Sequence, residues 1–296
     1  MPNVKLKNYF HLHFIVFVWG FTAILGKLIT IDALPLVWYR MLIALLIILA
    51  YVLIRRLPLR VPLRILVQLL AAGAVVAIHW VTFFMAIKVS NVSIALATMS
   101  TGAFFAALLE PFWYGRKIIW YEIVFGIVVM LGLYLIFKVE TEYIYGIGLA
   151  LVSAFLSALF SMLNGKLTQY GRPSVISFYE FGSGVFLLTL YLIFTGSFGS
   201  GFFELSGMDW LYIFILASFC TAYAFIASVR ILKYISPYTV MLTTNLEPVY
   251  GIFLAFFLLG ESERMNPVFY LGALIIIATV VANGILKNRD KLKKKT

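Results

Sequence analysis

Four ionisable side chains lie inside long apolar stretches of this 296-residue chain, where their types would permit solute binding or proton transfer. They are Arg40, His79, Glu180 and Glu247. An unpaired charge in apolar surroundings is costly, so a chain seldom places one there without a use. These four residues are therefore the first candidates for function.

The stretch LTTNLEPVYG, residues 242–251, combines a carboxylate, an amide and a proline within an apolar run. Pro248 lacks an amide hydrogen and would free the carbonyl of Thr244, which predicts a helix bend exposing polar backbone beside Asn245 and Glu247. We predict the central binding site here, with Glu247 either pairing with a substrate amine or cycling a proton. A neutral carboxylic acid hydrogen-bonded between helices is the structural alternative.

The composition places these residues in a membrane protein. Hydrophobic residues make up 63% of the chain and charged residues only 12%, against about 25% charged in soluble domains. Apolar windows long enough to cross a bilayer recur along the chain. Charges and Gly/Pro punctuation predict ten transmembrane helices, at 10–30, 35–54, 65–88, 92–114, 119–138, 146–168, 174–195, 208–230, 237–259 and 267–286.

The basic residues predict how these helices are oriented. Of the 23 Lys and Arg residues, eighteen fall in segments on the side of the N-terminus, four fall on the other side, and Arg40 lies within a span. This positive-inside bias places both termini in the cytoplasm, with residues 287–296 as a basic cytoplasmic tail. It also accounts for the net charge of +11 without a nucleic-acid partner, and makes the lipid bilayer the expected surrounding.

The predicted spans also give the charged residues a depth. At about 1.5 Å per residue, Arg40 lies about two turns below the outer face, Glu180 about two turns above the inner face, and Glu247 near the midplane. Arg40 and Glu180 are therefore not expected to touch. Arg40 either recognises an anionic group or snorkels to the outer headgroups. His79 either carries a proton or forms a structural hydrogen bond, and both a structural and a functional role stay open for Glu180.

Aromatic residues make up 17% of the chain, and most are expected in interfacial belts or against lipid. A subset lies near Arg40 and its counterpart in the second half. These residues could line a cavity through stacking and cation–π contacts. They are Trp19, Tyr39, Trp80, Tyr179 and Phe225.

Short sequence matches in order indicate an internal repeat. Gly26-Lys27-Leu28 returns as Gly165-Lys166-Leu167, a spacing of 139, and Tyr39-Arg40 aligns with Tyr179-Glu180 at 140. Gly115 aligns with Gly260 at 145. Two five-helix halves, 1–138 and 146–286, follow from this register. Because five is odd, the halves enter the membrane from opposite sides, an arrangement typical of secondary transporters with a site near the midplane.

The same residues resemble the drug/metabolite transporter superfamily in its ten-helix form with two EamA-type repeats. The resemblance rests on Trp19-Gly20-Phe21 before Gly26-Lys27, on Tyr39-Arg40, on 86–90, and on Pro248 followed by 258–261. It implies export or exchange of small metabolites, commonly amino acids, across the bacterial inner membrane. No motif in the sequence specifies the substrate.

The two halves have nevertheless diverged. Glu247-Pro248 corresponds in register to Gly102-Ala103, whereas Glu110-Pro111 lies eight residues later. The sites of the two halves therefore need not be symmetric.

Several other chemistries find no support in the sequence. A single cysteine, Cys220, excludes an internal disulfide and a thiolate metal cluster. The P-loop and the HExxH and GxSxG motifs are absent, so we expect neither an enzyme nor a cofactor or metal. The expected function is secondary transport by alternating access, with protons as a candidate coupling ion. A membrane sensor or scaffold and an intramembrane enzyme are the alternatives, and the oligomeric state, a monomer included, is left open.

Overall fold

The computed structural model describes residues 2–115, 117, 119–244 and 246–293. Its helices in the first half of the chain are α1 Pro2–Leu28, α2 Ala33–Ile54, α3 Leu63–Val89, α4 Val92–Met99, α5 Gly102–Tyr114 and α6 Trp120–Val139. A 3₁₀ turn, η1 Thr141–Tyr143, leads into the second half. There the helices are α7 Ile144–Leu167, α8 Pro173–Phe194, α9 Gly207–Ala217, α10 Ala224–Ile231, α11 Pro237–Thr244, α12 Glu247–Leu259 and α13 Pro267–Lys293. Short turns η2 Ser200–Phe202 and η4 Gly260–Glu263, and a π-helical turn η3 Ser218–Tyr223, complete the elements.

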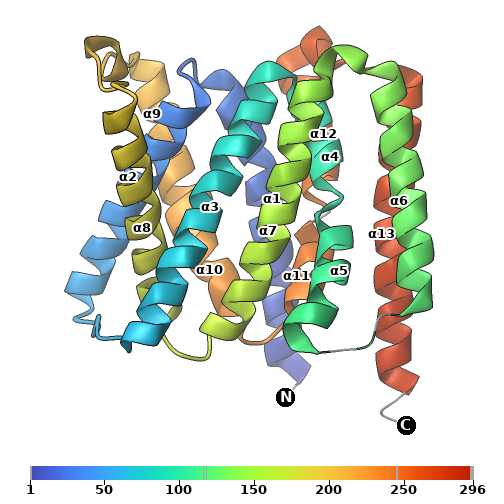
Figure 1. Cartoon of the computed structure of the whole chain (residues 1–296), viewed down its shortest axis with the longest axis horizontal. Helices are drawn as coiled ribbons and strands as arrows, with labels where there is room; N and C mark the ends of the chain where they lie inside the picture. The colour runs from blue at the N-terminus through green and yellow to red at the C-terminus, as the bar shows by residue number, and fades with distance from the viewer. Residues whose placement is uncertain (1, 116, 118, 245, 294–296) are drawn as a thin grey trace.

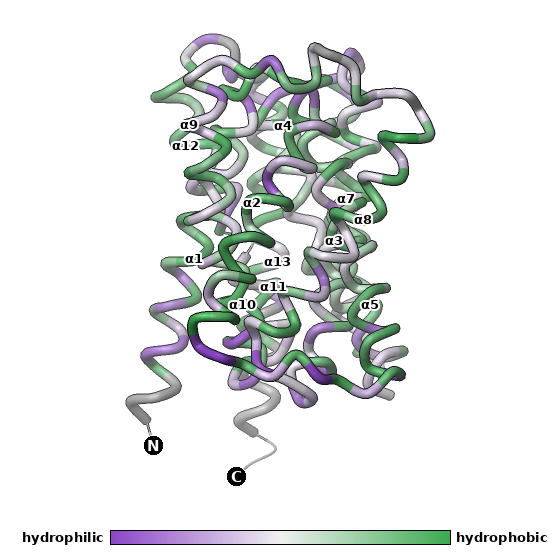
Figure 2. Tube along the Cα trace, turned by 90° about the vertical axis from the view of Figure 1, so that its left-hand side faces the viewer, coloured by the Kyte–Doolittle hydropathy of each residue, from purple (hydrophilic) through white to green (hydrophobic). Residues whose placement is uncertain are grey.

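The fold is an all-helical bundle whose long helices run between two ends (Figure 1). Among the described residues, seven helical stretches are long and apolar enough to cross a membrane, counting α4 with α5 and α9 to α10 as single stretches. Shorter apolar helices occupy 124–139, 247–259 and 267–283. Apolar residues dominate the middle of the bundle, and hydrophilic residues gather in the loops at its ends (Figure 2). This pattern is that of a multi-pass membrane protein.

The helices of the two halves pack in a matched way. Helix α3 of the first half packs against α7 and α8 of the second half. In return, η3 of the second half packs against α1 and α2, and α10 packs against α1 and α8. Helix α1 starts at the end of the bundle where α13 finishes, and α7 runs in the direction opposite to α1 (Figure 1). Equivalent helices therefore point in opposite directions, as an odd number of spans per repeat requires.

The last helix of each half packs against its counterpart at one side of the bundle. Helices α6 and α13 share a core that includes Leu133, Ile136 and Phe269. They approach closely because Gly132 and Gly272 face each other: a Cβ on Gly132 would lie 2.9 Å from the Gly272 carbonyl oxygen, and the reverse distance would be 2.8 Å. Glycine permits such close helix packing in membranes.

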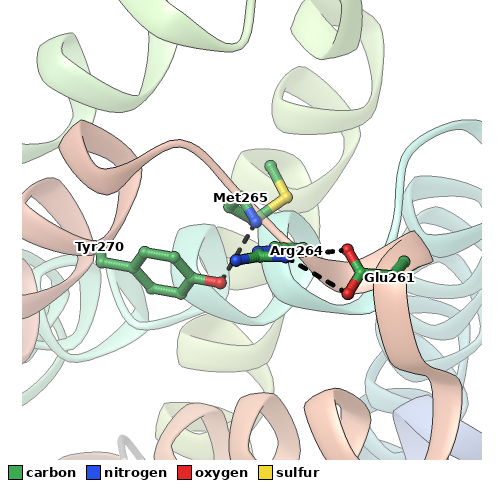
Figure 3. Close-up of polar contacts among 4 residues, drawn as sticks. All are labelled: Glu261, Arg264, Met265 and Tyr270. Carbon is green, nitrogen blue, oxygen red and sulfur yellow. Dashed lines mark hydrogen bonds and ion pairs between the residues drawn. The ribbon is translucent and has the colours of Figure 1, made fainter.

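The link between α12 and α13 closes the end of the bundle opposite the termini. Arg264 forms an ion pair with Glu261 at 3.2 Å, and the backbone N–H of Met265 donates to the Tyr270 hydroxyl at 3.2 Å (Figure 3). Both charged side chains are largely exposed, at 68% and 85%, so this ion pair contributes at most about 1 kcal/mol.

Two predicted spans are not continuous helices. The span expected at 92–114 divides into α4 and α5, and the span expected at 237–259 divides into α11 and α12. The interruption expected beside Pro248 is present, but one helix ends at Thr244 and another begins at Glu247 instead of a single helix bending there. Pro248 lies in the first turn of α12, where its missing amide hydrogen costs nothing.

Candidate functional site

A cavity lies between the two halves and is lined by both. It has a volume of about 90 Å³, room for several water molecules. Seven residues expected at the site line it, namely Trp19, Arg40, His79, Trp80, Phe225, Glu247 and Pro248. Hydroxyl groups add polarity to the wall, from Thr22, Ser157, Ser161, Ser228 and Thr244. The remaining lining includes Phe83, which follows His79 by one helical turn, and Phe160, which no pattern in the sequence singled out.

Arg40 projects from α2 into the bundle and is only 2% exposed. Its Nε donates to the Thr221 hydroxyl at 2.6 Å, and its guanidinium carbon lies 3.9 Å from the centroid of the Trp80 ring. A desolvated cation–π contact of this kind is worth about 2 kcal/mol. Arg40 therefore does not snorkel to the headgroups, because its side chain is held inward by these two partners.

The Arg40 guanidinium retains donors for a ligand. Its Nη1 is buried and has no hydrogen-bond partner among the described residues. The Thr22 hydroxyl, also on the cavity wall, is buried and, in the described part of the chain, has only the weakly polar Cys220 thiol beside it. A cationic donor and a hydroxyl that lack a strong partner at one cavity are suited to an anionic group such as a carboxylate.

The partner of Arg40 depends on the π-helical turn η3. In this turn the Thr221 hydroxyl donates to the Leu216 carbonyl five residues back, at 2.6 Å, and accepts from Arg40. Cys220 in the same turn lines the cavity. Single π turns within α-helices are frequent at functional sites. The sequence predicts one regular helix over 208–230 and gives no sign of this turn.

Glu247 begins α12 and contributes a carboxyl group to the same cavity. Among the described residues, no hydrogen bond or ion pair engages its carboxylate, and it is not within ion-pair distance of Arg40. The positive end of the α12 dipole stabilises a carboxylate at this position. The structural alternative, an acid hydrogen-bonded between helices, has no partner in this part of the chain. Asn245, the expected neighbour of Glu247, lies outside the described residues.

The two broken spans interrupt at equivalent positions. Met99 and Thr244, which end α4 and α11, are 145 residues apart, as are Gly102 and Glu247, which begin α5 and α12. This is the spacing of Gly115 and Gly260. Helix α4 packs against α12, and α5 packs against α11. Met99 and Thr244 both line the cavity, so the breaks meet at the site.

The first break arises without proline. The Thr101 hydroxyl donates to the Thr98 carbonyl at 2.8 Å, and the Ser100 N–H makes bonds to Leu96 and Ala97 carbonyls of 3.2 and 3.3 Å. Hydroxyl side chains that bond nearby carbonyls compete with the helical pattern. The signal available in the sequence was the pair Ser100-Thr101 before Gly102, which is weak by itself.

His79 joins the halves from the cavity wall. Its Nδ1 lies 2.9 Å from the Ser153 carbonyl and 2.8 Å from the Ser153 hydroxyl, and that hydroxyl donates to the His79 carbonyl at 2.9 Å. Two acceptors at Nδ1 assign the proton there and leave Nε2 as an acceptor. Nε2 has no partner within the described residues. His79 thus forms a structural hydrogen bond and keeps one nitrogen open, so both expected roles remain compatible.

The family model for the EamA-like transporter family matches residues 8–138 and 144–284. The chain belongs to the EamA-like transporter family. No curated protein matches it. Solved structures do, and one, described as "Crystal structure of protein", superposes with a TM-score of 0.70 over 95% of this chain and 98% of the other, at 16% identity. At that identity the likeness shows the fold alone.

Membership in the EamA-like transporter family indicates a membrane transporter of small solutes. The family model matches twice, once in each half, in agreement with the repeat read from the sequence. The match carries no information on substrate.

Three residues expected at the site lie elsewhere in this EamA-like protein. Tyr39 stacks on Phe202 with ring centroids 5.4 Å apart, and its hydroxyl donates to the Phe202 carbonyl at 3.2 Å. The Tyr179 hydroxyl donates to the Leu59 carbonyl in the loop before α3. Glu180 is fully buried and accepts from Asn164. On α2, Arg40 lines the cavity while the adjacent Tyr39 does not, and no described residue of α8 is among the residues that line it.

Two carboxylates tie the halves together at the end of the bundle opposite the termini. Asp209 accepts from the Thr30 backbone N–H at 2.6 Å and the Thr30 hydroxyl at 2.7 Å. Glu263, only 1% exposed, accepts from the backbone N–H groups of Val92 and Ser93 at 3.1 and 2.9 Å. Each bond joins one half to the other. Neither acid has a role that the sequence alone predicts.

Proposed function

We propose that this protein is a secondary transporter that exports or exchanges amino acids or similar small metabolites across the bacterial inner membrane. The observation that carries the proposal is the pair of opposite charges, Arg40 and Glu247, that face one cavity without pairing with each other. An α-amino acid carries a carboxylate and an ammonium group, and the cavity offers a counter-charge to each. The surrounding Trp19, Trp80 and Phe225 favour an apolar or aromatic side chain.

The proposed roles follow from the positions of the groups. Arg40 binds the carboxylate with help from Thr22, and Glu247 binds the ammonium group at the α11/α12 break. His79 accepts a hydrogen bond or a proton at Nε2. Bonds such as those of Asp209 and Glu263 break and re-form as the halves rock about the cavity in alternating access. Asn245 is proposed to add an amide beside Glu247.

The proposed topology has ten transmembrane helices in two inverted repeats, residues 1–138 and 146–286, with both termini and the tail 287–296 in the cytoplasm. The basic residues support this orientation. Alkaline phosphatase fused to the C-terminus should be inactive, and a fusion in the 260–264 turn should be active. Activity of the C-terminal fusion would contradict the orientation.

Counterflow in proteoliposomes tests the function. Vesicles preloaded with an unlabelled amino acid should accumulate the labelled amino acid transiently, which a sensor, scaffold or enzyme would not do. A thermal-shift screen selects the amino acids to use, because a ligand that binds the folded state raises its melting temperature. If no amino acid or related metabolite gives a shift or counterflow, the proposal fails.

A further inference from the structure

Glu180 and Asn164 form a fully buried pair with one hydrogen bond between them and two acceptor atoms that receive no hydrogen bond from the described residues. Asn164 Nδ2 donates to Glu180 Oε1 at 2.7 Å. Glu180 Oε2 and Asn164 Oδ1 are buried and have no donor among the described residues. Both side chains are 0% exposed. Two neighbouring acceptors that both lack a donor indicate that one of them carries a proton.

A single proton on Glu180 Oε2 would supply the donor that the pair lacks. In a carboxylic acid facing a carboxamide, Oε2–H donates to Oδ1 while Nδ2–H donates to Oε1, and the two bonds close a ring. An ionised carboxylate here would instead have one hydrogen bond and no counter-charge, an arrangement that is strongly unfavourable within a membrane protein. The acid form is the one that this environment accepts.

No cation in the described part of the chain neutralises Glu180. Helix α8 packs against α2, α3 and α10, and Asn164 belongs to α7. Arg40 on α2 donates a hydrogen bond to Thr221, and His79 on α3 is hydrogen-bonded to Ser153. Lys166 on α7 lies over the rings of Trp113 and Tyr114. The remaining basic residues of these helices are Arg64 and Lys88 on α3 and Arg230 on α10. Arg64 and Arg230 are exposed, and Lys88 donates to the Ile29 carbonyl.

The pair lies directly behind the cavity wall. Phe181, next to Glu180, packs against Phe225 with ring centroids 4.6 Å apart, and Phe160, one turn before Asn164, lines the cavity. Helix α3 crosses α8 closely at this point. The absence of a side chain on Gly73 permits this approach, since a Cβ there would collide with the Glu180 backbone carbonyl. Movement of α3, α7 or α8 would therefore alter both the cavity and the surroundings of the acid.

We propose that Glu180 and Asn164 form the proton-binding site of the transporter, occupied by a proton in this conformation. The proton leaves when the helices part and water reaches the carboxyl, since only a wetted carboxylate can hold its charge. This assignment rests on the proposed function for its role in transport, and it separates two carboxyl groups. Glu180 binds the coupling proton, and Glu247 remains free for the solute.

Infrared difference spectroscopy on the purified, reconstituted protein tests the site without any transport substrate. At neutral pH the wild type should show the carbonyl stretch of a protonated carboxylic acid, shifted in D₂O. Glu180→Gln should abolish that band, because its amide keeps the bond to Asn164 without an acid. Glu247→Gln is the matched control and should retain the band. Absence of the band from the wild type, or its persistence in Glu180→Gln, overturns the proposal.

A second variant covers the case in which Glu180→Gln does not fold. In Asn164→Ala the acid loses its acceptor, so the band should move to higher wavenumber. A band at the wild-type position would show that the acid is not bonded to Asn164 and would overturn the pairing.

Coupling is measured in vesicles with an imposed pH difference, using a solute that gives counterflow. One pH unit corresponds to about a tenfold accumulation ratio for each proton carried. The wild type should approach that ratio, and Glu180→Gln should exchange solute without accumulating it. Equal accumulation by both proteins overturns the coupling role. If the wild type shows no counterflow with any tested solute but does show the infrared band, the proposed function is rejected and the assignment of the proton to Glu180 is retained.

Discussion

The two broken spans share a backbone plan but differ in chemistry. At the first break the chain passes from Met99 through Ser100-Thr101 to Gly102, and at the second from Thr244 to Glu247 and Pro248. The first break offers hydroxyls bonded to its own carbonyls, whereas the second presents an unpartnered carboxylate to the cavity. The repeat thus places a helix break at the cavity in both halves, but only the second break carries an ionisable group.

The opposite charge comes from the other half of the molecule. Arg40 on α2 corresponds in register to Glu180 on α8. Arg40 faces the cavity and keeps a donor unsatisfied, whereas Glu180 is buried behind the wall with an amide partner. Each half therefore supplies one charged group to the cavity, from non-equivalent helices. An asymmetric solute needs such an asymmetric site.

The largest effect is expected for Glu247→Gln. A hydrogen bond to a charged group is worth about 1.5–3 kcal/mol, so counterflow of a solute with an ammonium group should fall about 10- to 150-fold. Melting temperature should change little, because no protein group pairs with the carboxylate. Wild-type counterflow from about pH 5.5 to about pH 8 in a well-folded variant would eliminate the role of Glu247.

Arg40→Lys should have the next largest effect. An ammonium group lacks the planar fork that bonds Thr221 and a carboxylate together, so counterflow should fall about tenfold despite the retained charge. Arg40→Ala should also lower stability, because it removes the contact with Trp80. If both variants transport normally, Arg40 serves only to hold α2.

Gly102→Ala is the matched change at the position equivalent to Glu247. The new Cβ would lie 3.0 Å from the terminal methyl of Met241, a flexible side chain. Counterflow should therefore fall no more than about threefold, with a loss of stability below about 1 kcal/mol. A loss as large as that of Glu247→Gln would show that the two breaks are functionally equivalent and would contradict the comparison.

Pro248→Ala should have the smallest effect. Proline in a first helical turn stabilises mainly by restricting the unfolded chain, so its removal should cost about 0.4–1 kcal/mol. Counterflow should remain close to wild type, because a helix can start at this position without a proline. Helix α5 starts at the equivalent Gly102, which is followed by Ala103. Complete loss of counterflow in a folded Pro248→Ala variant would show that proline itself forms the break.

The sequence alone determined the membrane class, the repeat and the family, because these depend on composition and on spacing along the chain. It also identified Arg40, His79 and Glu247 as candidates, since a charge in an apolar run is visible without coordinates. The break at Pro248 was expected because proline removes a helical hydrogen bond whatever surrounds it.

Only the tertiary structure decided which candidates share a cavity. Tyr39, Tyr179 and Glu180 turn away from it, while Trp80 and Phe225 face it, because the rotation of each helix is set by packing against several neighbours at once. The π turn at Thr221 and the break before Gly102 depend on local competition between side-chain and backbone bonds, which a single sequence signals weakly. The hydrogen bond between Glu180 and Asn164 joins two helices, and no pattern along the chain predicts it.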